Sequence, residues 1–302
     1  MTSQPSISVV VVSDYEAGHT KTWENERRIL AALAQQDIAE HFEILLILNS
    51  EFRGAFLESG LEAIPDLQTI FVDESQSAKL KDYGVQKTAS EYIAVLEADC
   101  IPCREWLRVL VDVLRSRKDI SVVSGRTTYG QETMFKRSLS LTDRGFDDPG
   151  NSGLTLHVSN NGALYRRSVL KKFPFPDAIT PFLSSRLRNH SMRKAGHRFY
   201  FERRAVMKHA LGGWEFVRDL RRNRGYADMM YHGDTRFFAV PKLLLSRLNR
   251  EVSNFKRLRA RYLRLYDWPL TMLLMIFGRF LEAPGMLDAV YRRNEIRRSS
   301  YR

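Results

Sequence analysis

Short apolar runs alternate with longer amphipathic segments through roughly the first 210 residues of the chain. The expected strands cover residues 7–12, 43–49, 68–72, 91–96, 120–124 and 197–201. The expected helices cover residues 22–36, 77–89, 104–117 and 183–194. Strands that alternate with helices of this length are typical of βαβ units. The pattern therefore predicts an α/β domain with a mostly parallel sheet flanked by helices.

The pattern changes after residue 240. Residues 243–265 interleave Leu and aromatic residues with Lys and Arg, and residues 268–277 are strongly apolar until Gly278-Arg279. A membrane-spanning helix needs about 20 apolar residues, so this run is expected to be too short to span. It is either a packing helix or an interfacial segment on a membrane surface. We therefore expect a domain over 1–240 and a basic, partly apolar helical extension over 241–302.

The positive charge is concentrated in that extension. Residues 242–302 hold 14 Lys or Arg against five acidic residues, and the whole chain carries a net charge of +12. Such a stretch favours an anionic membrane surface or acidic glycan. Nucleic-acid binding has the charge in its favour, but no binding module is recognised, so none is expected.

Two cysteines give no disulfide framework and no second pair for a zinc site. The chain starts without a signal-peptide pattern. We therefore expect a cytoplasmic protein, peripheral at the inner face of the cytoplasmic membrane.

Two carboxylates, Glu97 and Asp99, directly follow the apolar strand at 91–96, and Pro102 ends the extended run. Ligands bind outside the carboxyl ends of strands in open α/β sheets. Carboxylate oxygens there hold hard cations such as Mg²⁺ or Mn²⁺, which are shared with substrate phosphates. The pair predicts a nucleoside-diphosphate site.

The run from Tyr83-Gly84-Val85 through Glu97-Ala98-Asp99 to Trp106-Leu107 resembles the family 2 glycosyltransferases of the GT-A fold. In that family the two acids form the DxD motif, and here the first acid is Glu97. The resemblance implies a Rossmann-like fold, a nucleoside-diphosphate-sugar donor and a divalent metal. It also implies inverting transfer of the sugar to a glycan or lipid-linked acceptor.

The resemblance assigns roles to residues along the chain. The expected nucleotide contacts are Ser13, Glu16, Asn49, Lys81, Asp82 and Glu97. The expected metal ligands are Glu97, Asp99 and His209. Asn160 and Asn161 precede a helix start that matches the acceptor side of the family.

Arg218, Arg221 and Arg222 lie at helical spacing and are expected to gather on one face. Guanidinium groups bind phosphate oxygens bidentately, so such a cluster would steady the leaving diphosphate. The alternative is an ordinary solvated helix face.

The catalytic base is the weakest part of the resemblance. The acidic pair of the family, about a dozen residues before its glycine, corresponds to Ser184-Ser185 here. Ser185 thus occupies the catalytic position, yet an unassisted serine is a poor base. Asp177 or the Asp147-Asp148 pair, in an expected loop over 143–153, are candidates to replace it. Otherwise the acceptor is activated differently, or the protein is a non-catalytic scaffold subunit in polysaccharide assembly.

Overall fold

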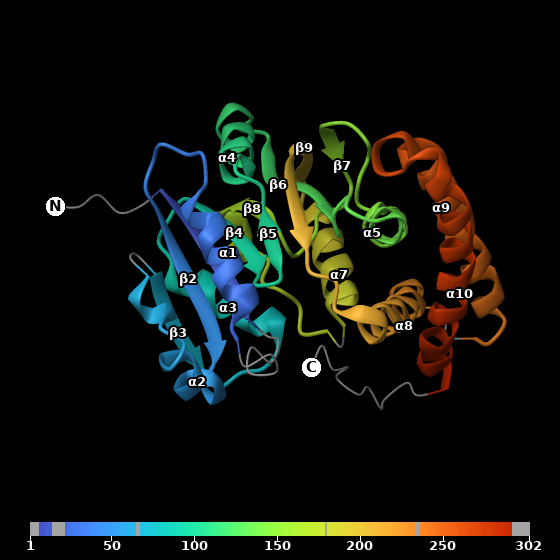
Figure 1. Ribbon diagram of the computed structural model, residues 1–302, viewed down its shortest axis with the longest axis horizontal. Helices are drawn as coiled ribbons and strands as arrows, with labels where there is room; N and C mark the ends of the chain where they lie inside the picture. Colours follow the sequence, from blue (N-terminus) through green and yellow to red (C-terminus); the bar gives the residue numbers. More distant parts are fainter. Residues whose placement is uncertain (1–5, 14–21, 65–66, 179, 234–235, 292–302) are drawn as a thin grey trace.

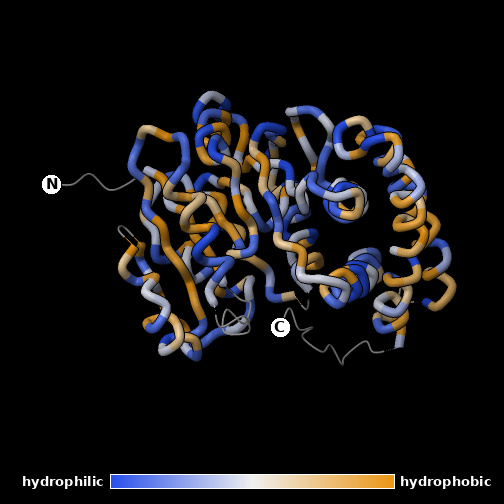
Figure 2. The backbone as a smooth tube through the Cα atoms, viewed as in Figure 1, coloured by the Kyte–Doolittle hydropathy of each residue, from blue (hydrophilic) through white to orange (hydrophobic). Residues whose placement is uncertain are grey.

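The computed structural model describes residues 6–13, 22–64, 67–178, 180–233 and 236–291. Figure 1 shows one sheet flanked by helices, with α9 and α10 at the end of the molecule opposite β2 and β3. Hydrophobic positions concentrate along the central strands and recur along the C-terminal helices (Figure 2). The α/β fold class is confirmed.

The strands form one sheet with the order β3-β2-β1-β4-β8-β6-β9-β5, and β7 pairs with β9. Their bounds are β1 Ile7–Ser13, β2 Phe42–Asn49, β3 Leu67–Val72, β4 Tyr92–Glu97, β5 Cys100–Pro102, β6 Ile120–Thr128, β7 Gly153–Thr155, β8 Ala163–Arg166 and β9 Arg198–His209. β3, β2, β1 and β4 are parallel, as are β6 and β9. β8, β5 and β7 pair antiparallel with their neighbours. Most paired residues lie in parallel pairs, which confirms the expected mostly parallel sheet.

Helices cover both faces of the sheet. Their bounds are α1 Glu24–Ala34, α2 Arg53–Leu57, α3 Ser77–Lys87, α4 Trp106–Ser116, α5 Met134–Leu139, α6 Arg167–Lys172, α7 Pro181–Lys194, α8 Gly213–His232, α9 Ala239–Tyr262 and α10 Trp268–Tyr291. On β1, Val9 and Val11 pack with α1 and α4, whereas Val10 and Val12 pack with α3, α6 and α7. Burial on both faces explains why the strand is continuously apolar.

Buried ion pairs join the C-terminal helices to the rest of the fold. We call them the buried ion network, and its members are Asp143, Arg221, Asp228, Arg247, Glu251, Arg279 and Glu282. These residues come from α8, α9, α10 and the π-helical turn η3 (Ser140–Arg144). The boundary expected at residue 240 lies at the beginning of α9, and the division into two units stays a prediction.

One expectation about a single segment was wrong. Residues 143–153 do not form a loop throughout, because η3 continues α5 through Arg144 and directs Asp143 into the buried ion network. Gly278-Arg279 ends the apolar run, as expected, but α10 continues through it, because Arg279 points inward and pairs with Glu251 and Glu282.

The longer helix also changes the length argument about the membrane. By length and composition, Leu265–Tyr291 is apolar enough to cross a membrane, so the run is not too short. Of its most apolar window, 39% is buried inside the protein. Core helices of soluble proteins pass the same test, and length alone therefore does not decide the matter.

Candidate active site

The carboxyl ends of β1, β2 and β4 meet at one edge of the sheet. Val12 of β1 pairs with Glu97 of β4, and the next residue, Ser13, pairs with Leu48 of β2. Asn49 follows directly at the end of β2. Three of the sequence-predicted site residues, Ser13, Asn49 and Glu97, are thus brought to the edge where α/β sheets bind ligands.

The Glu97 side chain is held from two sides. The buried ammonium group of Lys81 forms an ion pair with its carboxylate. Asn161 Nδ2 donates to Glu97 Oε2 at 2.8 Å, and Asn161 Oδ1 accepts from the Glu97 backbone N–H at 2.9 Å. The turn at Asn161 depends on Gly162, whose φ of +77° is a conformation that favours glycine. Asn161, expected on the acceptor side, therefore fixes the orientation of Glu97.

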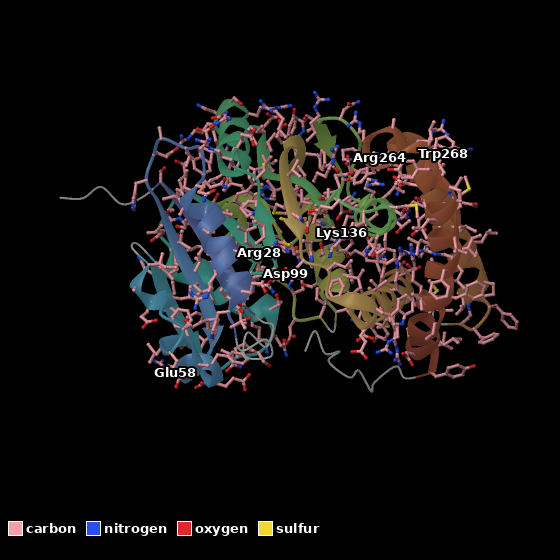
Figure 3. The ribbon with its side chains drawn as sticks, in the orientation of Figure 1. Arg28, Glu58, Asp99, Lys136, Arg264 and Trp268 are labelled. Carbon is pink, nitrogen blue, oxygen red and sulfur yellow. The ribbon has the colours of Figure 1, made fainter. Side chains whose placement is uncertain are left out.

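Within the described ranges, Asp99, Cys100 and His209 form a group whose ligand atoms all lie within 4.8 Å of one another. Asp99 lies near the centre of the molecule in Figure 3. His209 Nδ1 is 3.2 Å from Asp99 Oδ2 and 2.6 Å from the carbonyl oxygen of Ala210. An Nδ1–H that donates to this carbonyl leaves the lone pair on Nε2. Burial, together with the charge of Arg144, lowers the pKa of His209 well below its ordinary value, so the ring is a neutral potential ligand.

The donor set fits a hard cation better than a soft one. The carboxylate suits Mn²⁺ or Mg²⁺, the imidazole suits borderline transition metals, and soft metals prefer thiolates. Burial, reinforced by the Asp99 and Glu97 charges, raises the pKa of the Cys100 thiol well above its ordinary value, so the thiol stays neutral. Of the three expected metal ligands, Asp99 and His209 are in contact with each other. The third, Glu97, is paired with Lys81 instead.

The other expected nucleotide contacts have partners within the protein. Ser13 donates a hydrogen bond to the buried Glu26 of α1. Burial raises the pKa of Glu26. Asn49 Oδ1 accepts from the backbone N–H of Glu51 at 2.8 Å. Glu16 lies outside the described residues.

Asp82 is adjacent to Lys81 on α3 but serves a different segment. Its carboxylate accepts from the backbone N–H of Phe175 at 3.0 Å. Burial raises the pKa of Asp82 to about 6. The structure therefore uses Asp82 to attach α3 to the chain that leads into α7.

The three expected diphosphate arginines are not brought together. Arg221 is buried in the buried ion network. Arg218 pairs with Asp219 at 3.2 Å, and Arg222 pairs with Asp288 at 2.6 Å, both on the exposed side of α8. Arg218, Arg221 and Arg222 therefore do not form a cluster on one face of α8.

A cavity of about 330 Å³ opens among β6, α7, α8, α9 and the segment 142–148. Glu97, His209, Asn160 and Asn161 contribute to its wall, as does Ser185. Its charged and histidine lining is completed by Arg126, Arg144, Asp147, Asp148, His157, Arg186, Arg193, Arg224, His232, Arg247, Arg250 and Glu251. Seven arginines against four carboxylates make the cavity suited to an anionic ligand.

The carboxylates proposed as bases differ in their surroundings. Asp148 is buried and bonded to Arg126 Nε at 2.7 Å and to the Tyr262 hydroxyl at 2.8 Å. Asp177 is 62% exposed, lies 3.6 Å from Lys79, and is not among the residues that line the cavity. Asp147 does line the cavity, and burial raises its pKa to about 7.

Comparison with known proteins decides the family. The family model described as Glycosyl transferase family 2 matches residues 21–173, half of the chain. The chain belongs to glycosyl transferase family 2. No protein of curated function is a significant match to it.

Solved structures of glycosyltransferases share the fold of this family 2 chain. The mannosyltransferase PcManGT from Pyrobaculum calidifontis, in complex with GDP-Man and Mn²⁺, superposes with a TM-score of 0.60 at 15% identity, covering 97% of this chain and 89% of that one. TarS 1-349 from S. aureus superposes with a TM-score of 0.51 at 15% identity, covering 94% and 83%. The GT-A fold expected from the sequence is therefore confirmed.

The structure also adds site residues that sequence reasoning missed in this family 2 member. Arg224 of α8 lines the cavity, stacks on the rings of Phe146 and Phe182, and donates to the carbonyl oxygen of Asp143 at 2.8 Å. Burial, with Arg221 nearby, lowers its pKa to about 10. The available signal was the arginine run on one helix, but the pattern did not show which arginine faces the cavity.

Proposed function

We propose that this family 2 protein transfers a sugar from a nucleoside-diphosphate donor to a glycan or lipid-linked acceptor, with inversion at the anomeric carbon. The observation that carries the proposal is the contact of Asp99 with His209 at the carboxyl edge of the sheet, beside the arginine-lined cavity. The complex of PcManGT with GDP-Man and Mn²⁺ supports a sugar nucleotide and a divalent metal in this fold.

A divalent cation would be held by Asp99 and His209, with Glu97 on its nucleotide side. When bound, it supplies positive charge to the diphosphate that leaves. The protein itself orients the carboxylates: Lys81 and Asn161 fix Glu97, and the Ala210 carbonyl fixes the His209 ring. Preorganised charges of this kind favour the transition state because they need no reorientation during the reaction.

Asp147 is the proposed general base. The acceptor hydroxyl oxygen forms a bond to the anomeric carbon, the bond from that carbon to the diphosphate breaks, and Asp147 takes the hydroxyl proton. Asp147 is better placed than Asp148 or Asp177. The Asp148 carboxylate is already bonded to Arg126 and Tyr262, and Asp177 does not line the cavity. A pKa of about 7, raised by burial, suits a base that works near neutral pH.

The exposed side of α10 supports the proposed peripheral membrane location. Its large exposed apolar residues are Met272, Leu273, Ile276, Phe277, Phe280 and Tyr291. Trp214 of α8 extends this apolar row by stacking on Phe277 with ring centroids 5.6 Å apart. Exposed arginines precede α10, and residues 292–302 include five more, so basic sequence adjoins both ends of the row. Anionic lipid headgroups fit this combination.

Vesicle sedimentation tests the membrane location. Full-length protein should bind phosphatidylglycerol vesicles and not phosphatidylcholine vesicles, and Leu273→Asp with Phe280→Asp should weaken binding at least about tenfold. Leu57→Asp changes an exposed leucine of α2 instead and serves as the matched control. Unchanged vesicle binding in the double variant, or a dimer in solution that it dissociates, contradicts the proposal.

The catalytic proposal is tested by a panel of UDP- and GDP-sugars with Mn²⁺. The expected result is thermal stabilisation by at least one donor and slow release of its nucleotide, both lost in Asp99→Asn and kept in Asp177→Asn. Stabilisation without any turnover would instead support the non-catalytic scaffold alternative. The presence of Ser185 at the position of the family acid favours that alternative. A complete lack of response to every donor contradicts both.

A further inference from the structure

Three positive groups lie on the part of the cavity wall formed by α7, α9 and the segment before β8. We call Arg186, Arg193 and Arg250 the arginine group, and His157 lies among them. Partial desolvation and the charges of all three arginines lower the pKa of His157 to about 4. At neutral pH the ring is therefore uncharged and does not add to the repulsion.

Within the described part of the chain, Arg186 is the one member of the arginine group that forms an ion pair with a carboxylate. Arg186 forms an ion pair with Asp228, but Asp228 is also paired with Arg247. Asp228 is likewise the acid that attracts Arg250. Asp228 is thus shared by Arg186 and Arg247, although Arg247 also pairs with Glu282.

Arg193 has a buried hydrogen-bond donor that no described residue accepts from. Its Nε atom is buried and has no hydrogen-bond partner among the described residues. Arg250 stays exposed at the cavity, and partial desolvation together with the charge of Arg247 lowers its pKa. Buried guanidinium donors cost free energy unless an acceptor meets them.

We propose that the arginine group binds an oxyanion, a phosphate or carboxylate carried by the acceptor, and so makes this enzyme specific for anionic acceptors. The inference rests on the proposed function and names its acceptor class. Glu97 and His209 line the same cavity, so an acceptor anchored there has its hydroxyl within the cavity that adjoins the donor edge. Guanidinium forks bind phosphate and carboxylate bidentately, which fixes orientation as well as position.

The donor diphosphate is a less suitable occupant of the arginine group. The donor is expected at the carboxyl edge of β1, β2 and β4, where Ser13, Asn49 and Glu97 lie. The arginine group comes from α7 and α9, which contribute none of those residues. Donor affinity should therefore not depend on Arg193 or Arg250.

The test uses the full chain and glycerol 3-phosphate as the probe, with glycerol as its uncharged counterpart. Phenylglyoxal modifies accessible arginines, and mass spectrometry locates each modified residue. Glycerol 3-phosphate should slow modification of Arg193 and Arg250, and glycerol should not. Arg193→Gln and Arg250→Gln should each weaken probe binding about tenfold, the expected loss of one charged hydrogen bond. Arg28→Gln, an exposed arginine on α1, is the matched control.

Further arms distinguish the source of the oxyanion. Glucuronate compared with glucose tests a carboxylate, and phosphatidylglycerol compared with phosphatidylcholine vesicles tests a lipid headgroup. Protection of the arginine group by any of the charged probes supports the inference. Equal probe binding by the Arg193→Gln/Arg250→Gln variant and Arg28→Gln overturns it, as does loss of nucleotide-sugar binding in the double variant. Nucleotide binding with no anion binding would leave the proposed function standing and reject only this inference.

Discussion

Glu282 connects the C-terminal helices to the fold, and its replacement by Gln should destabilise the protein strongly. The side chain is fully buried and accepts from three arginines: Arg247 Nε at 2.7 Å, Arg279 Nη2 at 2.9 Å and Arg221 Nη1 at 3.2 Å. Burial alone would raise its pKa, but these arginines more than offset burial, so the pKa falls from 4.5 to about 2. At 1.36 kcal/mol per pH unit, this difference corresponds to about 3 kcal/mol.

The same magnitude follows from the contacts. Removal of one partner from a buried ion pair costs about 3–5 kcal/mol, because the other charge stays buried. Arg221 and Arg279 retain Glu251, and Arg247 retains Asp228, so the lower end of this range is expected. We therefore expect Glu282→Gln to lower the free energy of unfolding by about 3 kcal/mol at pH 7.

Urea unfolding followed by intrinsic fluorescence measures this loss. Glu215→Gln removes an exposed acid from α8 and should cost less than about 0.5 kcal/mol. The direction in which the stability contribution of Glu282 changes with pH also follows from its lowered pKa. A carboxyl whose pKa is lowered in the folded state contributes its full stability above pH 4.5, and the contribution fades as pH falls toward 2. The gap between wild type and Glu282→Gln should accordingly narrow below pH 4.5. A loss under about 1 kcal/mol at pH 7, or a gap unchanged at pH 3, refutes the reasoning.

Three further predictions concern the site. Asp147→Asn should lower kcat about 10²–10⁴-fold, and the wild-type rate should rise with pH through about 7, because a base acts only when ionised; a variant with the wild-type pH profile counts against this role. Lys81→Met leaves Glu97 without its buried cation and should cost about 3 kcal/mol in urea unfolding, whereas a cost near zero would show that the ion pair is unimportant. Gly162→Ala should destabilise the fold by about 1 kcal/mol or more in the same assay, because its φ of +77° is a conformation that a Cβ strains. Wild-type stability would show that the turn relaxes easily.

The sheet and its edge were predictable because strand burial leaves a direct pattern in the sequence. The apolar run of β1 is continuous because both of its faces are covered, and the apolar run of β4 likewise marks where its acids, Glu97 and Asp99, begin. The position of Asp99 beside His209 required the family resemblance, because 110 residues separate them and β5 must pair with β9 to bring them together.

The roles of the arginines were not predictable from spacing. Arg218, Arg221 and Arg222 share one helix, yet Arg221 is buried by acids from η3, α9 and α10 that lie 30 or more residues away. The same long-range pairing explains why Arg279 does not end α10. Helical periodicity describes which residues share a face, but partners distant in the sequence decide whether a charge can be buried there.

Binding of Mn²⁺ measured by electron paramagnetic resonance tests the central claim most directly. Free Mn²⁺ gives a strong signal in solution that decreases when the ion is bound by the protein. The account predicts that GDP or UDP increases Mn²⁺ binding to the wild-type protein and that Asp99→Asn abolishes this increase, whereas Asp177→Asn keeps it. Nucleotide-independent binding, or the same increase in Asp99→Asn as in wild type, contradicts a metal–diphosphate site at the end of β4.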